Sequence, residues 1–230
     1  MKLNELKPER LWYYFEEICK IPRLSKHEGQ MADYLVAFAE AHDLSYQIDS
    51  LKNIVIRKKG TPGFETRPIV VLQSHQDMVG EKNEGTPHDF YKDPIVPEIE
   101  DGWVKARGTT LGADDGIGMA AQLAILESST LEHPPLECLF TVDEETGLTG
   151  AFGLSPDFIE GRILINLDSE DWPEIFIGCA GGRDTRAWFT FQPEKVPSQT
   201  RAFRILVSGL KGGHSGDEIH KGHGNAIKIL

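Results

Sequence analysis

The sequence predicts an α/β protein in which helices are layered on a largely parallel sheet. Its apolar runs at residues 68–73, 136–142 and 162–167 are continuous rather than alternating, which is typical of strands buried on both faces. After Gly112, apolar side chains recur at helical spacing instead. Buried strands that alternate with helices indicate a layered α/β domain.

Two helices are expected before the first strand. Trp12, Phe15 and Ile18 recur at helical spacing and mark the first one. Ser25 and Glu28 have the spacing of a capping box, in which the serine satisfies a free backbone N–H group and the glutamate reaches back. We therefore expect the second helix to begin at Ser25.

The middle of the chain holds a short strand and a long polar stretch. Residues 53–57 are rich in β-branched side chains and predict a strand. Residues 80–101 are polar and contain three prolines. They predict a long surface loop, a feature that is often functional in compact domains.

The pattern changes after the predicted parallel core. Residues 185–191 alternate, and residues 204–207 resemble a neighbouring strand, as in an antiparallel sheet. We therefore expect two domains, residues 1–182 and 183–230. Residues 225–230 predict a helix that ends after about two turns, so the chain is expected to be part of something longer.

The composition excludes several classes of partner. Acidic residues outnumber basic ones by 36 to 24, and the basic residues are scattered, which argues against nucleic acid. No run approaches the roughly 20 apolar residues of a membrane helix, and the charged N-terminus is not a signal peptide. We expect a cytoplasmic protein. Its excess carboxylate indicates either a solvated surface or carboxylates held inside by metal ions.

The chain has three cysteines, which are Cys19, Cys138 and Cys179. They lie far apart and form no Cys-x-x-Cys pair. In a reducing cytoplasm such cysteines are usually buried thiols. We prefer that reading to metal ligation or nucleophilic catalysis.

Chemically active side chains follow the first predicted buried strand. His75 and Asp77 come directly after it and lie on the same side of an extended backbone. A neutral imidazole binds zinc well, and a neighbouring carboxylate can fix its tautomer. The alternative is a plain hydrogen bond between the two residues at the end of a strand.

Two adjacent carboxylates, Asp114 and Asp115, stand between glycines at the start of a predicted helix. One reading is an N-cap, where aspartate is favoured. The other is a backbone bent to aim a carboxylate, because one aspartate suffices for a cap. The residues alone leave both readings open.

Acidic residues also follow the other two buried strands. Asp143, Glu144 and Glu145 are consecutive, and Asp168 stands alone. Three adjacent acids cannot all stay ionised without compensation, which a dication supplies; the alternative is a solvated acidic turn. Strand alternation would send Glu144 and Glu145 opposite ways, so one is expected to bind metal and the other to act as general base.

The conjunction of these groups predicts a metal site. In open α/β sheets, ligands bind at the carboxyl ends of the strands, which is where the acids and the histidine stand. Oxygen and nitrogen ligands without thiolate suit Zn²⁺, with Mn²⁺ or Co²⁺ as alternatives. A site so rich in carboxylate can hold two ions, which activate a water and polarise a carbonyl for hydrolysis.

Four longer stretches resemble a known family. They are residues 75–79 (HQDMV), 105–118 (KARGTTLGADDGIG), 143–147 (DEETG) and 210–216 (LKGGHSG). They are similar to the bacterial aminoacyl-histidine dipeptidases, also called cytosol non-specific dipeptidases, which belong to the co-catalytic zinc peptidases together with carboxypeptidase G and the aminoacylases. The resemblance covers essentially the whole chain. It implies a three-layer catalytic domain, the beginning of an α+β lid domain, and hydrolysis of dipeptides, including those that end in histidine.

The resemblance also implies which residues bind two zinc ions. His75 and Asp168 would bind the first ion, and Glu145 would bind the second. Asp114 would bridge both ions, with an unusual cis peptide bond to Asp115. These assignments are expectations carried over position by position.

Three further residues would act in catalysis. Asp77 would orient the zinc-binding histidine, Glu144 would be the general base, and His214 would help to stabilise the tetrahedral oxyanion from the lid, often across a homodimer. In the family the second zinc ion takes another histidine from a C-terminal segment, for which His220 and His223 are poor substitutes. The site is therefore expected to be incomplete in these 230 residues.

Three hypotheses remain open on this basis. The first is a metallodipeptidase or its N-terminal part. The second is an amidohydrolase of the same fold that acts on N-acyl amino acids, because substrate choice lies in the lid and pocket rather than in the metal ligands. The third is a truncated, non-catalytic fragment that binds at most one metal ion.

Overall fold

The computed structural model describes residues 3–169, 171, 173–179, 181–183, 185–212 and 218–230. The chain divides into two units, Met1–Gly178 and Cys179–Leu230. The predicted domain boundary at residue 182 stays a prediction.

The first unit is built on a five-stranded sheet with the order β1-β2-β6-β3-β7. The strands are β1 (Ser45–Ile48), β2 (Ile54–Lys58), β3 (Val70–His75), β6 (Leu136–Thr141) and β7 (Ile163–Asn166). β3 runs parallel to β6 and β7, whereas β2 is antiparallel to both β1 and β6. The largely parallel sheet is thus confirmed, since β2 runs against the direction that the other four strands of this sheet share.

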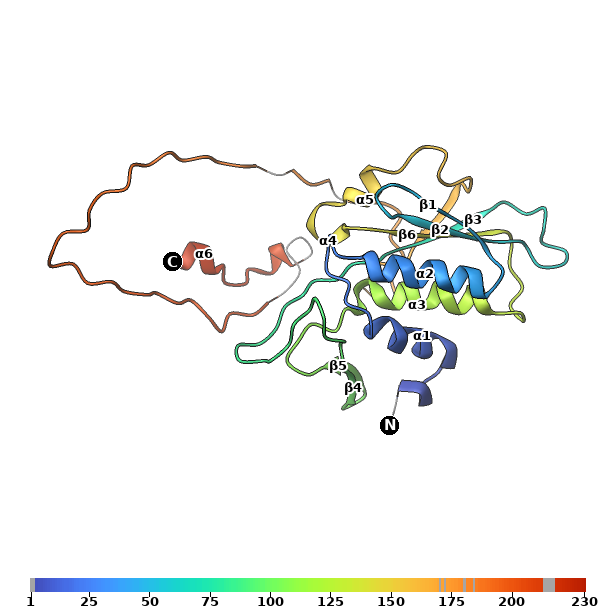
Figure 1. Ribbon diagram of the computed structural model, residues 1–230, viewed down its shortest axis with the longest axis horizontal. Helices are drawn as coiled ribbons and strands as arrows, with labels where there is room; N and C mark the ends of the chain where they lie inside the picture. Colours follow the sequence, from blue (N-terminus) through green and yellow to red (C-terminus); the bar gives the residue numbers. More distant parts are fainter. Residues whose placement is uncertain (1–2, 170, 172, 180, 184, 213–217) are drawn as a thin grey trace. The chain divides into compact units, whose positions relative to one another are not determined.

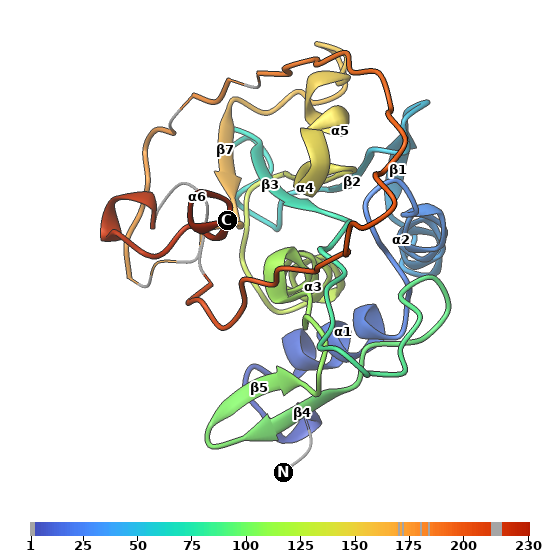
Figure 2. The same ribbon diagram turned by 90° about the vertical axis from the view of Figure 1, so that its left-hand side faces the viewer.

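Side chains of the sheet alternate between two cores, as the pleat requires. Ile54 and Ile56 of β2 belong to the larger core, whereas Val55 packs with Phe158 in a smaller core on the other face. Helices cover the larger core in both views of the molecule (Figures 1 and 2). They are α1 (Glu9–Cys19), α2 (Gly29–Ala41) and α3 (Ala113–Glu127). The short α4 (Glu144–Gly147) and α5 (Thr149–Phe152) follow β6.

The second of these helices begins at Gly29, and no side chain caps it. Ser25 donates its hydroxyl to the carboxylate of Asp77 (2.8 Å) instead, and the Glu28 carboxylate accepts the backbone N–H group of Asp143 (2.9 Å). The predicted capping box at Ser25 is therefore wrong. Both side chains have the right spacing for a cap, but the Ser25 hydroxyl binds a partner far away in the sequence. The Glu28 carboxylate reaches back to the N–H group of Lys26 (2.9 Å) and not to that of Ser25, in addition to its distant partner Asp143.

The predicted long loop ends in a strand. β4 (Pro97–Glu100) pairs antiparallel with β5 (Trp103–Ala106), so the prediction of a loop through residue 101 is partly wrong. Asp101 and Gly102 form the turn, and both have positive φ angles, 52° and 82°. Asp-Gly is a strong signal for a tight hairpin turn, and it could have revealed these strands.

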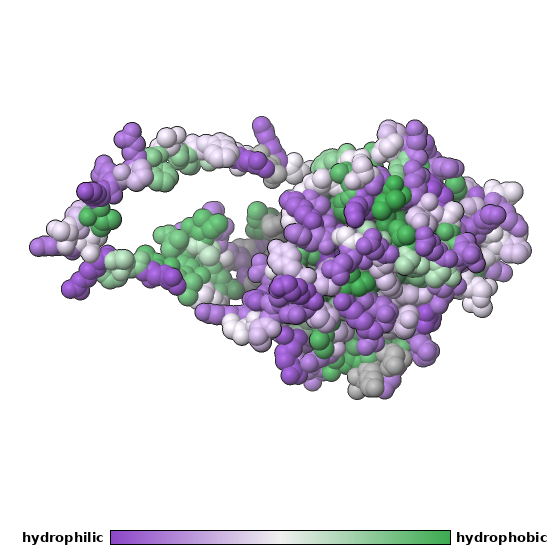
Figure 3. Space-filling view, viewed as in Figure 1, coloured by the Kyte–Doolittle hydropathy of each residue, from purple (hydrophilic) through white to green (hydrophobic). Residues whose placement is uncertain are grey.

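The second unit has little regular structure among its described residues, only η2 (Ile219–Lys221) and α6 (Ala226–Ile229). The predicted strands at residues 185–191 and 204–207 are wrong, since neither range is a strand here. A strand needs a neighbour for its backbone groups, and the described parts of these ranges have none. Figure 3 shows hydrophobic residues exposed along this unit, and its Cys179 is exposed as well, contrary to the expectation of a buried thiol.

The last helix agrees with the sequence reading in a shorter form. α6 follows Asn225, whose side chain accepts the N–H group of Lys228 (3.1 Å) and so caps the helix. Within the described residues, no helix combines the length and the apolar character needed to cross a membrane.

Candidate metal centre

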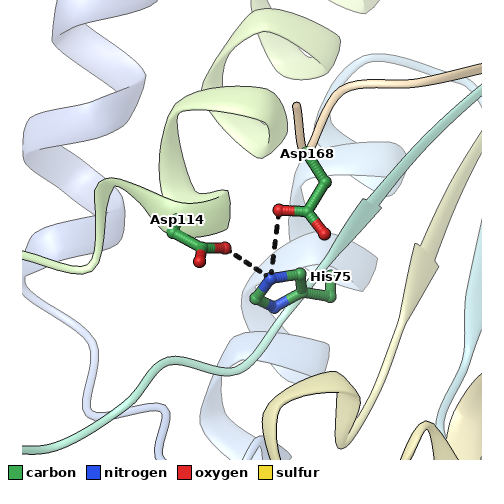
Figure 4. A group of neighbouring side chains, drawn as sticks. All are labelled: His75, Asp114 and Asp168. Atoms are coloured by element: carbon green, nitrogen blue, oxygen red, sulfur yellow. Dashed lines mark hydrogen bonds and ion pairs between the residues drawn. The ribbon is translucent and has the colours of Figure 1, made fainter. Parts of the chain in front are cut away.

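The three parallel strands of the first unit bring their carboxyl ends to one edge of the sheet. His75 is the last residue of β3, Asp143 stands two residues after β6, and Asp168 stands two residues after β7. α3 packs against β3, and its start brings Asp114 to the same edge (Figure 4). The residues that the sequence motifs single out therefore lie together at the carboxyl edge of the parallel strands.

His75, Asp114 and Asp168 point toward one another at this edge (Figure 4). The Nε2 atom of His75 lies 2.8 Å from Oδ1 of Asp114 and 3.7 Å from Oδ1 of Asp168. One ligand atom from each residue lies within 4.8 Å of the other two. The histidine side chain is buried, but those of Asp114 and Asp168 are 44% and 25% exposed, so an ion can reach the group from solvent.

Asp77 is fully buried on the opposite side of the imidazole. Its Oδ1 lies 3.2 Å from Nδ1 of His75, and its carboxylate accepts the N–H groups of Glu144 (3.0 Å) and Glu145 (3.2 Å). Burial by itself would raise the pKa of Asp77, but the bonds from His75, Glu144 and Ser25 outweigh it and lower the pKa to about 2. Asp77 thus stays ionised and links the histidine to the two glutamates.

Glu144 and Glu145 begin a helical turn, α4, rather than extending the strand. Asp143 has a φ of 53° and turns the chain out of β6. Successive helical side chains are about 100° apart, so the prediction that strand alternation sends the two glutamates opposite ways is wrong. Glu145 lines the cavity beside Asp168, and Glu144 is not among the lining residues.

The two adjacent aspartates do different things. The Asp115 carboxylate is buried and accepts the N–H group of Gly118 (3.1 Å), as a capping residue does, whereas Asp114 faces His75. The two readings of the sequence therefore apply to one residue each. The peptide bond between them is cis, as the resemblance implied.

The carboxylates at this edge disfavour one another's charge. Burial raises the pKa of Asp115 to about 8 and that of Glu145 to about 7, with Asp168 and Asp114, respectively, adding to the rise. Burial also raises the pKa of Asp168. Negative charge held this close together is stabilised by a cation.

The imidazole and its partners fit a divalent metal ion. Burial alone would lower the pKa of His75, but hydrogen bonds to Asp114, Asp168 and Asp77 raise it to about 12. The carboxylates thus attract positive charge to Nε2, the atom that a metal ion would share with them. One imidazole nitrogen with carboxylate oxygens is a usual ligand set for zinc. The residues present therefore fit the ion.

A cavity of about 620 Å³ opens beside the carboxylates. Asp114, Glu145 and Asp168 contribute its charged side. Its apolar lining comes from Val79, Leu111, Ile117 and Leu167. A concave site with an apolar wall and a few converging polar groups suits a small organic ligand.

One predicted site residue is not described by the structure, and two buried polar residues near the site were not predicted. His214 lies outside the described residues, so its part in catalysis stays a prediction. The sequence reading missed Asn53, which is fully buried and whose side chain binds the N–H group of Val142 (3.1 Å) and the carbonyl of Gly150 (3.0 Å). It also missed Gln122, which binds the carbonyl of Leu72 (2.7 Å). A polar residue within an apolar run is the signal that could have found Gln122, and a polar residue directly before an apolar strand is the one that could have found Asn53.

The comparison with known families agrees with this geometry. The family model for peptidase family M20/M25/M40 matches residues 71–193, more than half of the chain. The chain belongs to this family. The match includes all of β3 except its first residue, the start of α3 and the α4 turn, which are the elements that build the candidate metal centre.

Individual proteins that are similar to this chain support the assignment. The cytosol non-specific dipeptidase of Escherichia coli (strain K12) is 52% identical over 229 residues, which cover 100% of this chain and 47% of that protein. The crystal structure of aminoacylhistidine dipeptidase from Vibrio alginolyticus has a TM-score of 0.78 and 44% identity, covering 100% of this chain and 47% of that one. A tripeptidase from Staphylococcus aureus has a TM-score of 0.60 and 26% identity, covering 74% and 45%.

The chain thus spans about half the length of these relatives. All three residues of the candidate metal centre, His75, Asp114 and Asp168, belong to the first unit of this chain.

Proposed function

We propose that this chain carries the metal-binding part of a dipeptidase active site, which hydrolyses dipeptides, including those that end in histidine. The observation that carries the proposal is the convergence of His75, Asp114 and Asp168 beside a cavity. Membership of a peptidase family supports peptide hydrolysis. The names of the Escherichia coli and Vibrio alginolyticus relatives support dipeptides as the substrate class.

His75, Asp114 and Asp168 would hold the first divalent ion, with Zn²⁺ favoured over Co²⁺ and Mn²⁺. Asp114 and Glu145 would contribute to a second ion in the complete site. A bound divalent ion supplies Lewis acidity that polarises the peptide carbonyl and lowers the pKa of water. Asp77 would keep the proton of His75 on Nδ1, so that Nε2 is free to bind the ion.

Glu144 would act as the general base. It would take a proton from the attacking water and deliver it to the amine that leaves when the peptide C–N bond breaks. Burial raises the pKa of Glu144, which brings the carboxyl closer to the range useful for proton transfer near neutral pH.

The test is the change Glu144→Gln. Loss of the base should lower the rate of dipeptide hydrolysis about 10²- to 10⁴-fold while zinc stays bound. Rates and bound zinc are measured on the chain extended by the second half of the Escherichia coli relative, and bound zinc also on the chain alone. Glu145→Gln is the matched control, and it is expected to weaken the binding of the second ion. Loss of zinc from Glu144→Gln would mean that the two glutamates have exchanged roles.

The substrate assignment has its own test. An unblocked dipeptide ending in histidine should be hydrolysed, and its N-acylated counterpart should not. Activity confined to acylated amino acids would favour the amidohydrolase hypothesis. Failure of the chain to bind any zinc would exclude the metal centre itself.

Location and assembly complete the proposal. The name of the Escherichia coli relative supports a cytosolic location. A homodimer formed through the lid domain rests on the family resemblance. Sedimentation of the extended protein at micromolar concentration checks it, and a monomer would contradict it.

A further inference from the structure

A buried arginine lies between α1 and α2, in a part of the chain to which the proposed mechanism gives no role. Arg23 is 2% exposed. Its Nη1 donates to the carbonyl oxygens of Gln76 (3.0 Å) and Asp77 (2.6 Å), and its Nη2 donates to the carbonyl oxygen of Gly112. One guanidinium therefore joins the loop that follows β3 to the loop that precedes α3. These two loops adjoin His75 at the end of β3 and Asp114 at the start of α3, which supply the imidazole and the first carboxylate of the metal centre.

The main chain of the same segment holds the first loop as well. The carbonyl of Arg23 accepts the N–H group of Met78 (3.1 Å), and Leu24 pairs with Met78 in an isolated parallel bridge. Because backbone and side chain both bind this loop, the position of Arg23 relative to β3 is well defined.

Two glycines make room for the guanidinium. A Cβ atom on Gly112 or on Gly116 would lie 2.7 Å from Nη2 of Arg23, closer than real Cβ contacts allow. Gly112 also has a φ of 70°, which favours glycine. The glycines that flank Asp114 and Asp115 thus have a steric partner, and the motif is shaped in part by the arginine.

The donors of Arg23 serve carbonyl groups rather than an acid. Among the described residues, no carboxylate forms an ion pair with it. A buried cation without such a pair is costly, and burial lowers its pKa. Its charge still favours the ionised form of Asp114. A costly group that ties two site loops together calls for a functional explanation.

We propose that Arg23 is a positioning residue for the metal centre. By fixing the loop after β3 to the start of α3, it holds Nε2 of His75 and Oδ1 of Asp114 at the 2.8 Å separation from which both can bind one ion. Arg23 is not among the residues that line the cavity, so it acts through the backbone. The inference rests on the proposed metal centre.

The change Arg23→Lys tests it. Lysine keeps the positive charge, but one ammonium group cannot serve both loops. The 230-residue chain and the variant are titrated with Zn²⁺ at a temperature where both are folded, and with Co²⁺ to record the visible absorption of the bound ion. We expect zinc affinity to fall about 10- to 100-fold, the usual range for groups that orient ligands, and the Co²⁺ spectrum to change.

Arg57→Lys is the matched control. Arg57 is half-buried and binds Glu137 (2.9 Å) and the carbonyl of Phe158 (2.9 Å), at the opposite end of β6 from the metal centre. It should lower the stability of the chain but leave zinc affinity and the Co²⁺ spectrum unchanged. A purely structural Arg23 would behave in the same way as this control.

A second variant keeps the inference testable if Arg23→Lys does not fold. Gly116→Ala retains the arginine and adds a better helix former to α3, but its Cβ displaces the guanidinium. It should also weaken zinc binding. If the folded variants keep the zinc affinity and the Co²⁺ spectrum of the unchanged chain, the inference about Arg23 is wrong, but the proposed metal centre is not affected. Absence of zinc binding in the unchanged chain would overturn the proposed metal centre, and the inference with it.

Discussion

Asp77 connects the parts of the candidate centre that do different chemistry. It faces Nδ1 of His75 and accepts the N–H groups of Glu144 and Glu145, while Ser25 binds the same carboxylate. One buried side chain therefore orients the imidazole and anchors the turn that carries the proposed base. A change at this residue should disturb both.

The change Asp77→Asn should weaken zinc binding about 10- to 100-fold. The amide puts an NH₂ group, which is a donor, in place of one carboxylate oxygen, and the groups around that oxygen are themselves donors. Competition with a chromogenic chelator measures the affinity. Asp157→Asn, at an exposed position, should bind zinc as the unchanged chain does. Equal affinity in the two variants would refute the orienting role.

Among the secondary structure elements, a buried asparagine ties the start of β2 to the end of β6. Asn53 accepts the N–H group of Val142 and donates to the carbonyl of Gly150 and to the carboxylate of Asp49. The chain leaves β6 at this point to form the glutamate turn. The position of the turn therefore depends on a partner about 90 residues earlier in the sequence.

The change Asn53→Ala should lower the free energy of unfolding by about 3 kcal/mol, since it leaves a buried N–H group and a buried carbonyl without partners. Urea unfolding followed by tryptophan fluorescence measures it. Asn83→Ala, at an exposed position in a loop, serves as the control and should change stability little. A loss below about 1 kcal/mol at Asn53 would show that water or a shifted backbone satisfies the two groups.

For the whole molecule, metal binding and folding are linked. An ion that binds only the folded chain should stabilise it by about 2.7 kcal/mol at a free concentration 100 times its dissociation constant. Thermal unfolding with and without Zn²⁺ measures the effect, and a chelator should reverse it. His75→Ala should remove the gain, whereas His27→Ala, at an exposed position, should retain it. An equal gain in both variants would place the ion elsewhere.

The three thiols report on the folded state as a whole. Burial raises the pKa of Cys19 to about 12 and also raises that of Cys138, and both side chains are buried, whereas Cys179 is exposed. The thiolate is the reactive form, so a thiol reagent should modify one cysteine per native chain at neutral pH and all three in denaturant. Rapid reaction of more than one thiol in the native chain would contradict the packing of Cys19 or Cys138.

Much of the fold of the first unit could be predicted because its signals are local. Continuous apolar runs marked β3, β6 and β7, and helical spacing marked α3, since each pattern reflects which faces of one element are buried. Parallel strands end at one edge, so the sequence also predicts that His75 and Asp168 lie near each other, as they do. The hairpin β4–β5 was missed although its Asp-Gly turn is equally local.

What only the tertiary structure decided concerns partners far apart in the chain. Ser25 and Glu28 match a helix cap by spacing, yet Ser25 binds Asp77, and Glu28 binds Asp143 as well as the nearby Lys26, because the packed fold brings Asp77 and Asp143 to them. The backbone of β6 turns at Asp143, which makes the glutamate pair helical. The sequence by itself determined which residues could form a metal centre, since ligand chemistry and strand order are local properties; the contacts that aim those residues were decided by the tertiary structure, because each joins segments that only the packed fold brings together.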